Sequence, residues 1–330
     1  MNNLISQLIK RLETTHFPEA NIAIMPHFCI DNYVQYGKNL ESFVNEIQDI
    51  AHQGGGNLAL AQNLKIGGKA ANCASALSAL GLKSFLIAKT DELGYRVLQH
   101  LNEGTDIDIS HVSKDGALAL TTAIELKGAN IMLSDQGSLA DFGPDSLTES
   151  DMELLKQADF VCISDWGLND KGTELAQSVF GYVKDHGRGK TFFDPGDPSP
   201  KKEKTSEEIN TMRKSILKEG LVDILSVNEN EIERYGGLDE LRQNCRVDLH
   251  TKGYSASYYA DKETNHIPAF EVEPKRLTGA GDAWNAGDIL GEILGLTDEL
   301  RLLLANATAG FYISSSEDKH PQRGDLIEFI

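Results

Sequence analysis

Short apolar runs alternate with helix-like stretches along most of the chain. The candidate strands among these runs are residues 21–30, 84–90, 160–166, 190–196, 222–228 and 247–253. An alternation of strands and helices predicts a parallel sheet with helices on both faces, which is an α/β fold. The first seventeen residues instead have the apolar spacing of an amphipathic helix.

Polar residues stand at the ends of several of the predicted strands. They are Asp31, Asp165, Asp194 and Asn228. The carboxyl ends of parallel strands meet at one edge of an open sheet, and ligands bind at that edge. The pattern therefore indicates which edge of the sheet carries the function.

Two regions depart from this alternation. Residues 32–66 and 116–134 contain β-branched and alternating positions that suggest strands outside the main sheet. We expect one domain over residues 1–330 with these two regions as a small β lid. The alternative is a surface hairpin or an edge strand that has no role in binding.

Composition and charge narrow the function classes. The formal net charge of −19 argues against nonspecific binding to nucleic acid or to an anionic membrane surface, because both depend on excess Lys and Arg. No run of about 18 apolar residues predicts a membrane span, and the N-terminus lacks the features of a secretory signal, so we expect a cytoplasmic protein. The cysteines are far apart and form no CxxC pair, which predicts reduced thiols; they are Cys29, Cys73, Cys162 and Cys245.

The segment "RLTGAGDAWNAGDILG", residues 276–291, places small residues and an acid at a predicted helix start. A helix N-terminus attracts anions, and Gly279, Ala280 and Gly281 let an anion approach the backbone amides. Asp282 could then accept a proton from an incoming hydroxyl, which suits phosphoryl transfer to an alcohol. A close helix crossing or a tight turn would use the same glycines, and no Walker A lysine follows.

A second glycine-rich segment, "IGGKAANCASALSALG", covers residues 66–81. Gly67 and Gly68 could bring the backbone next to a ligand, and Asn72 offers a donor and an acceptor to ligand hydroxyls. The alternative is structural, because small residues on a helix also permit close packing.

Together and in this order, the two segments resemble the signatures of the ribokinase-like carbohydrate kinases, also called the PfkB family. Further stretches are similar to motifs of that family between residues 20 and 315. They are "CID" ending at Asp31, "KTDELG" with Asp91 and Gly94, "NENE" at 228–231, "TKG" at 251–253 and "LLANATAG" with Asn306.

The resemblance implies a three-layer ribokinase-like fold with a central, mostly parallel sheet, flanking helices and a β lid. It implies that Asp282 is the general base and that the amides of Gly279, Ala280 and Gly281 form an anion hole. It also implies the remaining site residues. The nucleotide would contact Asn228, Glu231, Thr251, Gly253 and Asn306, and the acceptor would contact Asp31, Gly67, Gly68 and Asn72.

ATP and Mg²⁺ are the cofactors that the resemblance implies, with Glu231 organising magnesium through water. The acceptor stays open between a sugar, a nucleoside and a sugar phosphate. Aromatic residues near Asp31 would suit a nucleobase, whereas a phosphorylated acceptor would need cations; the candidates are Phe28, Tyr33 and Tyr36 for the first and Lys65, Lys69 and Arg96 for the second. We also expect a homodimer formed through the lid.

Arg276 departs from the family pattern. Many relatives carry an acid six residues before the catalytic Asp, where it helps to bind an activating potassium ion, and an arginine there makes potassium dependence doubtful. Two other classes compete with a kinase. One is a catalytically silent binding or regulatory protein, and the other is a nicotinamide-dependent oxidoreductase, which the lack of G-x-G-x-x-G after the first strand disfavours.

Overall fold

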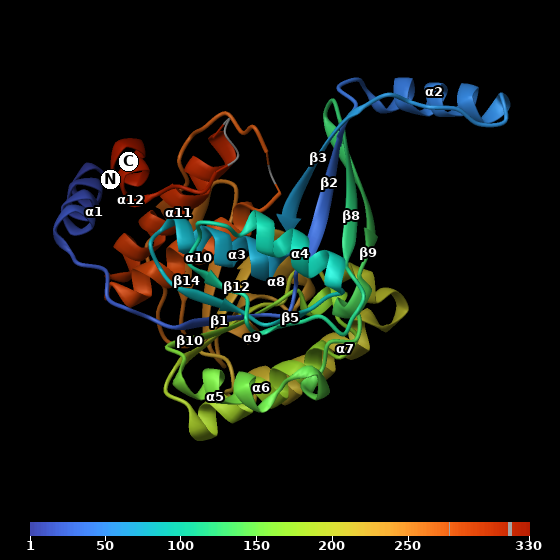
Figure 1. Cartoon of the computed structure of the whole chain (residues 1–330). Helices are drawn as coiled ribbons and strands as arrows, with labels where there is room; N and C mark the ends of the chain where they lie inside the picture. Colours follow the sequence, from blue (N-terminus) through green and yellow to red (C-terminus); the bar gives the residue numbers. More distant parts are fainter. Residues whose placement is uncertain (277, 316–318) are drawn as a thin grey trace.

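A nine-stranded sheet forms the centre of the molecule (Figure 1). The structure is a computed structural model that describes residues 1–276, 278–315 and 319–330. The strands of the main sheet are, in spatial order, β15 (Ile267–Pro268), β14 (Tyr254–Tyr258), β13 (Arg246–His250), β12 (Ile224–Asn228), β11 (Lys190–Asp194), β10 (Phe160–Ser164), β1 (Ile22–Met25), β4 (Ser84–Leu86) and β6 (Ile107–Asp108). Neighbours are parallel from β13 to β6, while β14 and β15 are antiparallel. The predicted α/β class with a mostly parallel sheet is confirmed.

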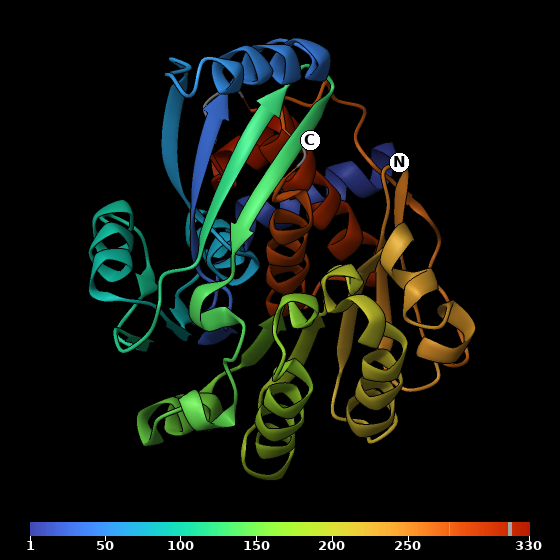
Figure 2. The same cartoon turned by 90° about the vertical axis from the view of Figure 1, so that its right-hand side faces the viewer.

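Helices cover both faces of the main sheet, giving three layers (Figures 1 and 2). On one side lie α3 (Lys69–Ala79), α10 (Ala280–Ile293) and α11 (Asp298–Ser314), with α1 (Asn2–Thr14) and α12 (Arg323–Phe329) packed on α11. On the other side lie α5 (Glu149–Gln157), α6 (Gly172–His186) and α7 (Thr205–Met212). The remaining helices are α2 (Leu40–His52), α4 (Glu92–Leu101), α8 (Glu229–Arg234) and α9 (Leu238–Leu241). No helix in the described part of the chain could cross a membrane.

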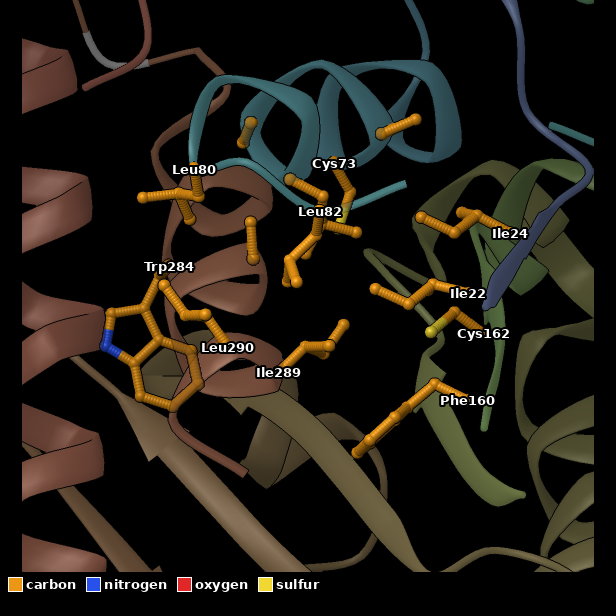
Figure 3. Close-up of a cluster of buried hydrophobic side chains, with 14 of the residues drawn as sticks. Ile22, Ile24, Cys73, Leu80, Leu82, Phe160, Cys162, Trp284, Ile289 and Leu290 are labelled. Atoms are coloured by element: carbon orange, nitrogen blue, oxygen red, sulfur yellow. The ribbon is translucent and has the colours of Figure 1, made fainter. Parts of the chain in front are cut away.

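The central strands are apolar on both sides because both faces of the sheet are buried. Ile22 and Ile24 of β1 point toward α3 and α10, where Figure 3 shows them beside Cys162 and Ile289. The alternate β1 residues, such as Ala23, belong to the second core below the sheet. The thiols are free, as predicted, and most of them are buried.

From the sequence we predicted one strand over residues 21–30, and this prediction is wrong. The run contributes to two strands in different sheets. β1 ends at Met25, and β2 (Cys29–Gln35) begins after a cis Met25–Pro26 bond. Proline has no N–H to donate to a ladder, which is consistent with the strand ending there. The bend lies at the carboxyl edge of the main sheet and places His27 there.

A separate four-stranded sheet, called the small sheet below, extends from this edge (Figure 2). Its strands are β3 (Ala61–Gly67), β2, β8 (Leu120–Leu126) and β9 (Ala129–Asp135), in that order, and a further short pair is β5 (Ala88–Lys89) with β7 (Val112–Ser113). Within the region 32–66, where we expected only strands, residues 40–52 form helix α2. Phe43 of α2 packs edge-on against Tyr36, and together with Leu126 they form a small core.

A buried ionic network ties α10 and α11 to β13 and β14. The guanidinium of Arg301 is almost fully buried and contacts Asp288 of α10, lies 3.1 Å from Asp248 of β13 and donates to Ser257 Oγ of β14 at 2.6 Å. Arg246 donates through Nε to Asp248 at 2.9 Å. Burial raises the pKa of Asp288 to about 7, although Arg301 acts against it.

We expect Arg301→Ala to lower the free energy of unfolding by about 3–5 kcal/mol, because it leaves buried carboxylates without their cation. Urea denaturation followed by circular dichroism measures this. Arg96→Ala is the control, since Arg96 forms an exposed ion pair with Glu92 and its loss should cost less than about 1 kcal/mol. Equal effects of the two substitutions would contradict the assigned importance of the network.

Candidate active site

A cavity of about 620 Å³ opens at the carboxyl edge of the main sheet, between the start of α10 and the small sheet. Both glycine-rich segments reach it. The predicted site residues that line it are Asp31, Gly68, Asn72, Asn228, Thr251, Gly279, Ala280, Gly281, Asp282 and Asn306. Three predicted residues do not belong to its lining: Gly67, Glu231 and Gly253.

The N-terminus of α10 forms one wall of the cavity. Gly279 precedes the helix with φ +83°, in the left-handed region that favours glycine, and a Cβ there would lie 2.9 Å from Tyr312 Oη. The first amides of a helix have no acceptor within it. The amides of Ala280 and Gly281 therefore have no acceptor within the helix.

Asp282 is in the first turn of α10 and is buried. Its Oδ2 accepts a hydrogen bond from Asn72 Nδ2 at 3.1 Å, which joins the two glycine-rich segments across 210 residues of sequence. Burial raises the pKa of Asp282 to about 7, against the opposing charge of Lys69. A carboxyl group with this pKa is suited to accept a proton near neutral pH.

Lys69 lines the cavity and is paired with a carboxylate. Its Nζ lies 3.2 Å from both carboxylate oxygens of Asp194, which also accepts from Asn285 Nδ2 at 2.8 Å. Burial alone lowers the pKa of Lys69, but the carboxylates of Asp194 and Asp282 outweigh it and hold the pKa well above its usual value. Lys69 is therefore a fixed cation beside Asp282.

His27 is a site residue that the sequence analysis missed. Its Nδ1 contacts Asp165 Oδ2 across 138 residues of sequence, and burial alone raises the pKa of Asp165, but His27 brings it below the usual value. Asp165 has φ +58°, an uncommon conformation for a non-glycine residue. Next to this pair, Gly68 has φ +91° and a Cβ there would lie 2.6 Å from the carbonyl oxygen of His27, so only glycine fits.

Asp31 faces the cavity from the inner side of the small sheet. It is in register with Thr121 of β8, which in turn pairs with Ser134 of β9, and both of these residues line the cavity. Burial raises the pKa of Asp31, and Cys29 Sγ donates to its Oδ1 at 3.1 Å. A Cβ on Gly67 would overlap the Asp31 carboxyl group, so Gly67 makes room for Asp31 instead of touching the cavity.

The "NENE" motif forms the cap of α8. Asn228 Oδ1 accepts from the amides of Asn230 and Glu231 at 2.8 and 3.0 Å, and Glu231 Oε2 accepts from the amide of Asn228 at 3.0 Å. Burial, with help from the charge of Asp194, raises the pKa of Glu231 to about 7. Within the described ranges, no group of three or more acidic, His or Cys side chains could hold a metal ion.

The polar atoms of Thr251 and Asn306 are used within the protein. Thr251 Oγ1 accepts from the amides of Gly253 and Tyr254 at 3.1 and 3.0 Å, which shapes the turn after β13. Asn306 Oδ1 accepts from Trp284 Nε1 at 2.9 Å, and its Nδ2 donates to the backbone carbonyls of residues 267 and 268. Asn306 therefore holds Trp284 in place at the wall of the cavity.

Arg276 lies at the C-terminal end of α11. Its guanidinium donates to the carbonyl of Ser315 at 2.9 Å and to that of Tyr312 at 3.3 Å, and it lies over the Tyr312 ring. A cation at this position interacts favourably with the helix dipole. The "KTDELG" stretch does not line the cavity. Its Asp91 caps α4 by accepting a hydrogen bond from the amide of Gly94 at 2.7 Å.

Solved structures share this architecture. The ribokinase of Arabidopsis thaliana, complexed with ribose and ATP, superposes with a TM-score of 0.73 at 16% identity, over 94% of this chain and 99% of that one. The adenosine kinase of Sinorhizobium meliloti gives a TM-score of 0.72 at 17% identity, over 91% of this chain and 95% of that one. At these identities the likeness shows the fold, and it confirms the ribokinase-like prediction.

Sequence comparison adds the family. The ribokinase of Bacillus subtilis is 25% identical over 276 residues, which cover 80% of this chain and 87% of that protein. The model of the family described as pfkB family carbohydrate kinase matches residues 40–323. The chain therefore belongs to the pfkB family of carbohydrate kinases, and it is a phosphotransferase with an alcohol group as acceptor.

Proposed function

We propose that this protein transfers the γ-phosphoryl group of ATP to a hydroxyl of a small neutral polyol, a sugar or a nucleoside. The observation that carries the proposal is the position of Asp282. This buried carboxyl group, with its pKa raised to about 7, lies at the N-terminus of α10 in the same cavity as Asp31 and Asn72. A proton acceptor, an anion site and hydroxyl-binding groups therefore converge in one place.

In the proposed mechanism, Asp31 and Asn72 orient the acceptor so that one hydroxyl faces Asp282. Asp282 takes the hydroxyl proton while the acceptor oxygen bonds to the γ-phosphorus and the bond from that phosphorus to the bridging oxygen breaks, releasing ADP. The amides at 279–281 stabilise the charge on the transferred group. The small sheet excludes water from the cavity, which limits hydrolysis of ATP.

The residues of the cavity fit a nucleotide bound with magnesium. Beyond the start of α10, the cavity is lined by Asn228, Glu229, Asn230, Thr251 and Lys252, which follow the adjacent strands β12 and β13. We propose that Glu231 reaches Mg²⁺ through water, since a hard cation that prefers oxygen ligands keeps several of its waters. When bound, the metal neutralises charge on the phosphates.

The charges around the acceptor end favour a neutral substrate over a sugar phosphate. Of the cations considered for a second phosphate, Lys69 is bound by Asp194, and Arg96 is exposed on α4 and paired with Glu92. Lys65 has its ammonium 4.6 Å from the centre of the Tyr33 ring and is not among the cavity-lining residues. The wall also has apolar side chains that suit a nucleobase or the carbon face of a sugar; they are Met132, Leu139 and Leu168.

We propose that Arg276 takes the place of an activating monovalent cation. Its guanidinium is bonded to the last carbonyls of α11 and lies over Tyr312, whose hydroxyl is next to Gly279. A fixed positive charge is therefore already built into this side of the anion hole.

We also propose a homodimer formed through the outer face of the small sheet. Leu64 and Leu133 lie in one register row of that face and are more than half exposed. Helix α2 adds apolar side chains that are also exposed: Leu40, Val44 and Ile47. Exposed apolar groups of this extent favour association with a second copy.

A coupled assay of ADP release, run with Mg-ATP and a panel of sugars, nucleosides and sugar phosphates, tests the proposed reaction. We expect turnover with a neutral polyol, and we expect the same rate with and without potassium because Arg276 supplies the charge. A sugar phosphate as the preferred acceptor would contradict the neutral site. ATP binding without turnover on any acceptor would favour a catalytically silent binding protein.

Asp282→Asn should lower turnover by about a hundredfold or more, because the amide cannot accept the hydroxyl proton. In the wild type, kcat/KM should rise with pH up to about 7, since only the ionised form of Asp282 is a base. The variant should lack this rise. Its free energy of unfolding at pH 8 should be no lower than that of the wild type, because the substitution removes a carboxylate whose ionisation burial disfavours. Unchanged turnover would exclude Asp282 as the base.

Leu133→Asp should convert the proposed dimer into a monomer, because it places a charge in the apolar contact. Sedimentation velocity measures the change. Leu93→Asp is the matched control, since Leu93 is similarly exposed but lies on helix α4 and not on a strand of the small sheet. A monomeric wild type would refute the dimer and leave the proposed reaction untouched.

A further inference from the structure

His250 is the last residue of β13 and opens onto the cavity, but the proposed mechanism gives it no role. It is partly buried, and its ring lies 4.9 Å from the ring of Trp284, centre to centre. Within the part of the chain that the structure describes, neither ring nitrogen has a hydrogen-bond partner. A polar side chain without a protein partner at a cavity wall is a candidate to bind a ligand.

The imidazole is directed at the glycine loop before Asp282. A Cβ built on Gly281 would lie 3.5 Å from Cε1 of His250. Cε1 is the carbon between the two ring nitrogens, so the edge that carries the nitrogens faces the start of α10. The amides of that helix start and the imidazole edge therefore border the same space, where an anion would sit.

Trp284 fixes the orientation of His250. It lies one turn into α10 after Gly281, and its Nε1 donates to Asn306 Oδ1 at 2.9 Å. Asn306 is in turn held by the two backbone carbonyls at 267 and 268. The imidazole packs at an interplanar angle of 31° against an indole that is itself held by α11 and by the backbone of β15.

The charge state of His250 suits a hydrogen-bond donor. Burial lowers its pKa to about 4, although the carboxylates of Asp194, Glu229 and Asp248 act against burial and Lys69 acts with it. A neutral imidazole keeps one N–H and one acceptor nitrogen. The neutral imidazole of His250 can therefore donate its N–H to a phosphate oxygen, with no proton transferred between them.

We propose that His250 is a phosphate-binding residue, which donates its N–H to a phosphate oxygen of the nucleotide held at the N-terminus of α10. The proposal rests on the proposed kinase function and assigns to Asn306 and Trp284 the role of positioning residues for His250. The main alternative is a purely structural imidazole that only fills space beside Trp284.

Two substitutions at His250 separate hydrogen-bond donation from ring packing against Trp284. His250→Phe keeps a ring on Trp284 and removes the N–H, whereas His250→Gln removes the ring and keeps an N–H donor. Calorimetric titration with Mg-ADP and with adenosine measures phosphate-dependent and phosphate-independent binding separately. We expect the Phe variant to bind Mg-ADP about ten- to a hundredfold more weakly, because a hydrogen bond to a charged group is lost. Adenosine affinity should stay within about twofold, and the Gln variant should regain most of the ADP affinity.

His266→Ala is the control, because His266 also packs against an aromatic ring, that of Tyr254, but does not line the cavity. Its nucleotide affinities should equal those of the wild type. Equal losses for adenosine and ADP in the Phe variant, or no loss for either, would overturn the phosphate contact and leave the kinase proposal standing. A wild-type protein that binds neither ADP nor ATP would instead overturn the proposed function together with this inference.

Discussion

The active edge of this protein depends on one partly buried lysine that is surrounded by carboxylates. Lys69 contacts Asp194 directly, and the charges of Asp282, Asp165 and Glu231 also act on it. Acids gathered at the ends of parallel strands repel one another in a low-dielectric interior when they are ionised, and a cation among them offsets this repulsion. The lysine follows Gly68 directly, at the start of α3, so the same segment provides the cation and Asn72, which holds Asp282.

This arrangement exposes the pKa of Asp282 to two opposing effects. A carboxylate close to Lys69 would have a low pKa, whereas a buried carboxyl group beside Asp194 and Asp165 would have a high one. Burial dominates and sets the pKa near 7, because the strongest contact of Lys69 is with Asp194 and not with Asp282. Asp194 thus affects the pKa of the proposed base, Asp282, by pairing with Lys69, and it does so without a bond to Asp282.

The parts of the fold and site that could be predicted from sequence are those with local causes. Strands buried on both faces must be apolar, and a left-handed backbone at Gly68 or Gly279 favours glycine, so both leave a visible pattern. The contact of His27 with Asp165 joins residues 138 positions apart, and no local pattern marks it. Helix α2 was not predicted from the sequence. It packs mainly through Phe43 on the distal part of the small sheet and exposes several of its other apolar residues.

Motif residues also differ in what their atoms do, which a sequence cannot show. Asn228 and Glu231 cap each other at α8, Gly67 makes room for Asp31, and Asn306 holds an indole. In each case the residue supports the structure around the cavity, through its polar atoms or, at Gly67, through the absence of a Cβ. The residues best placed to bind a ligand are those whose polar groups have no partner within the protein. Such residues can be identified only from the three-dimensional structure.

The scarcity of cations at the cavity has a consequence for how phosphate is bound. In a chain with net charge −19, Lys69 is committed to Asp194, and Lys252 is the other lysine in the cavity lining. In the proposed complex, affinity for a polyphosphate would then come mainly from neutral donors, namely the helix amides at 279–281 and the imidazole of His250, and from the proposed metal. Neutral donors release the product more readily than a cluster of lysines would, because the ionic attraction between ADP and the protein is smaller. An acidic protein can therefore bind a phosphate through backbone amides, and the weaker ionic attraction favours release of the product.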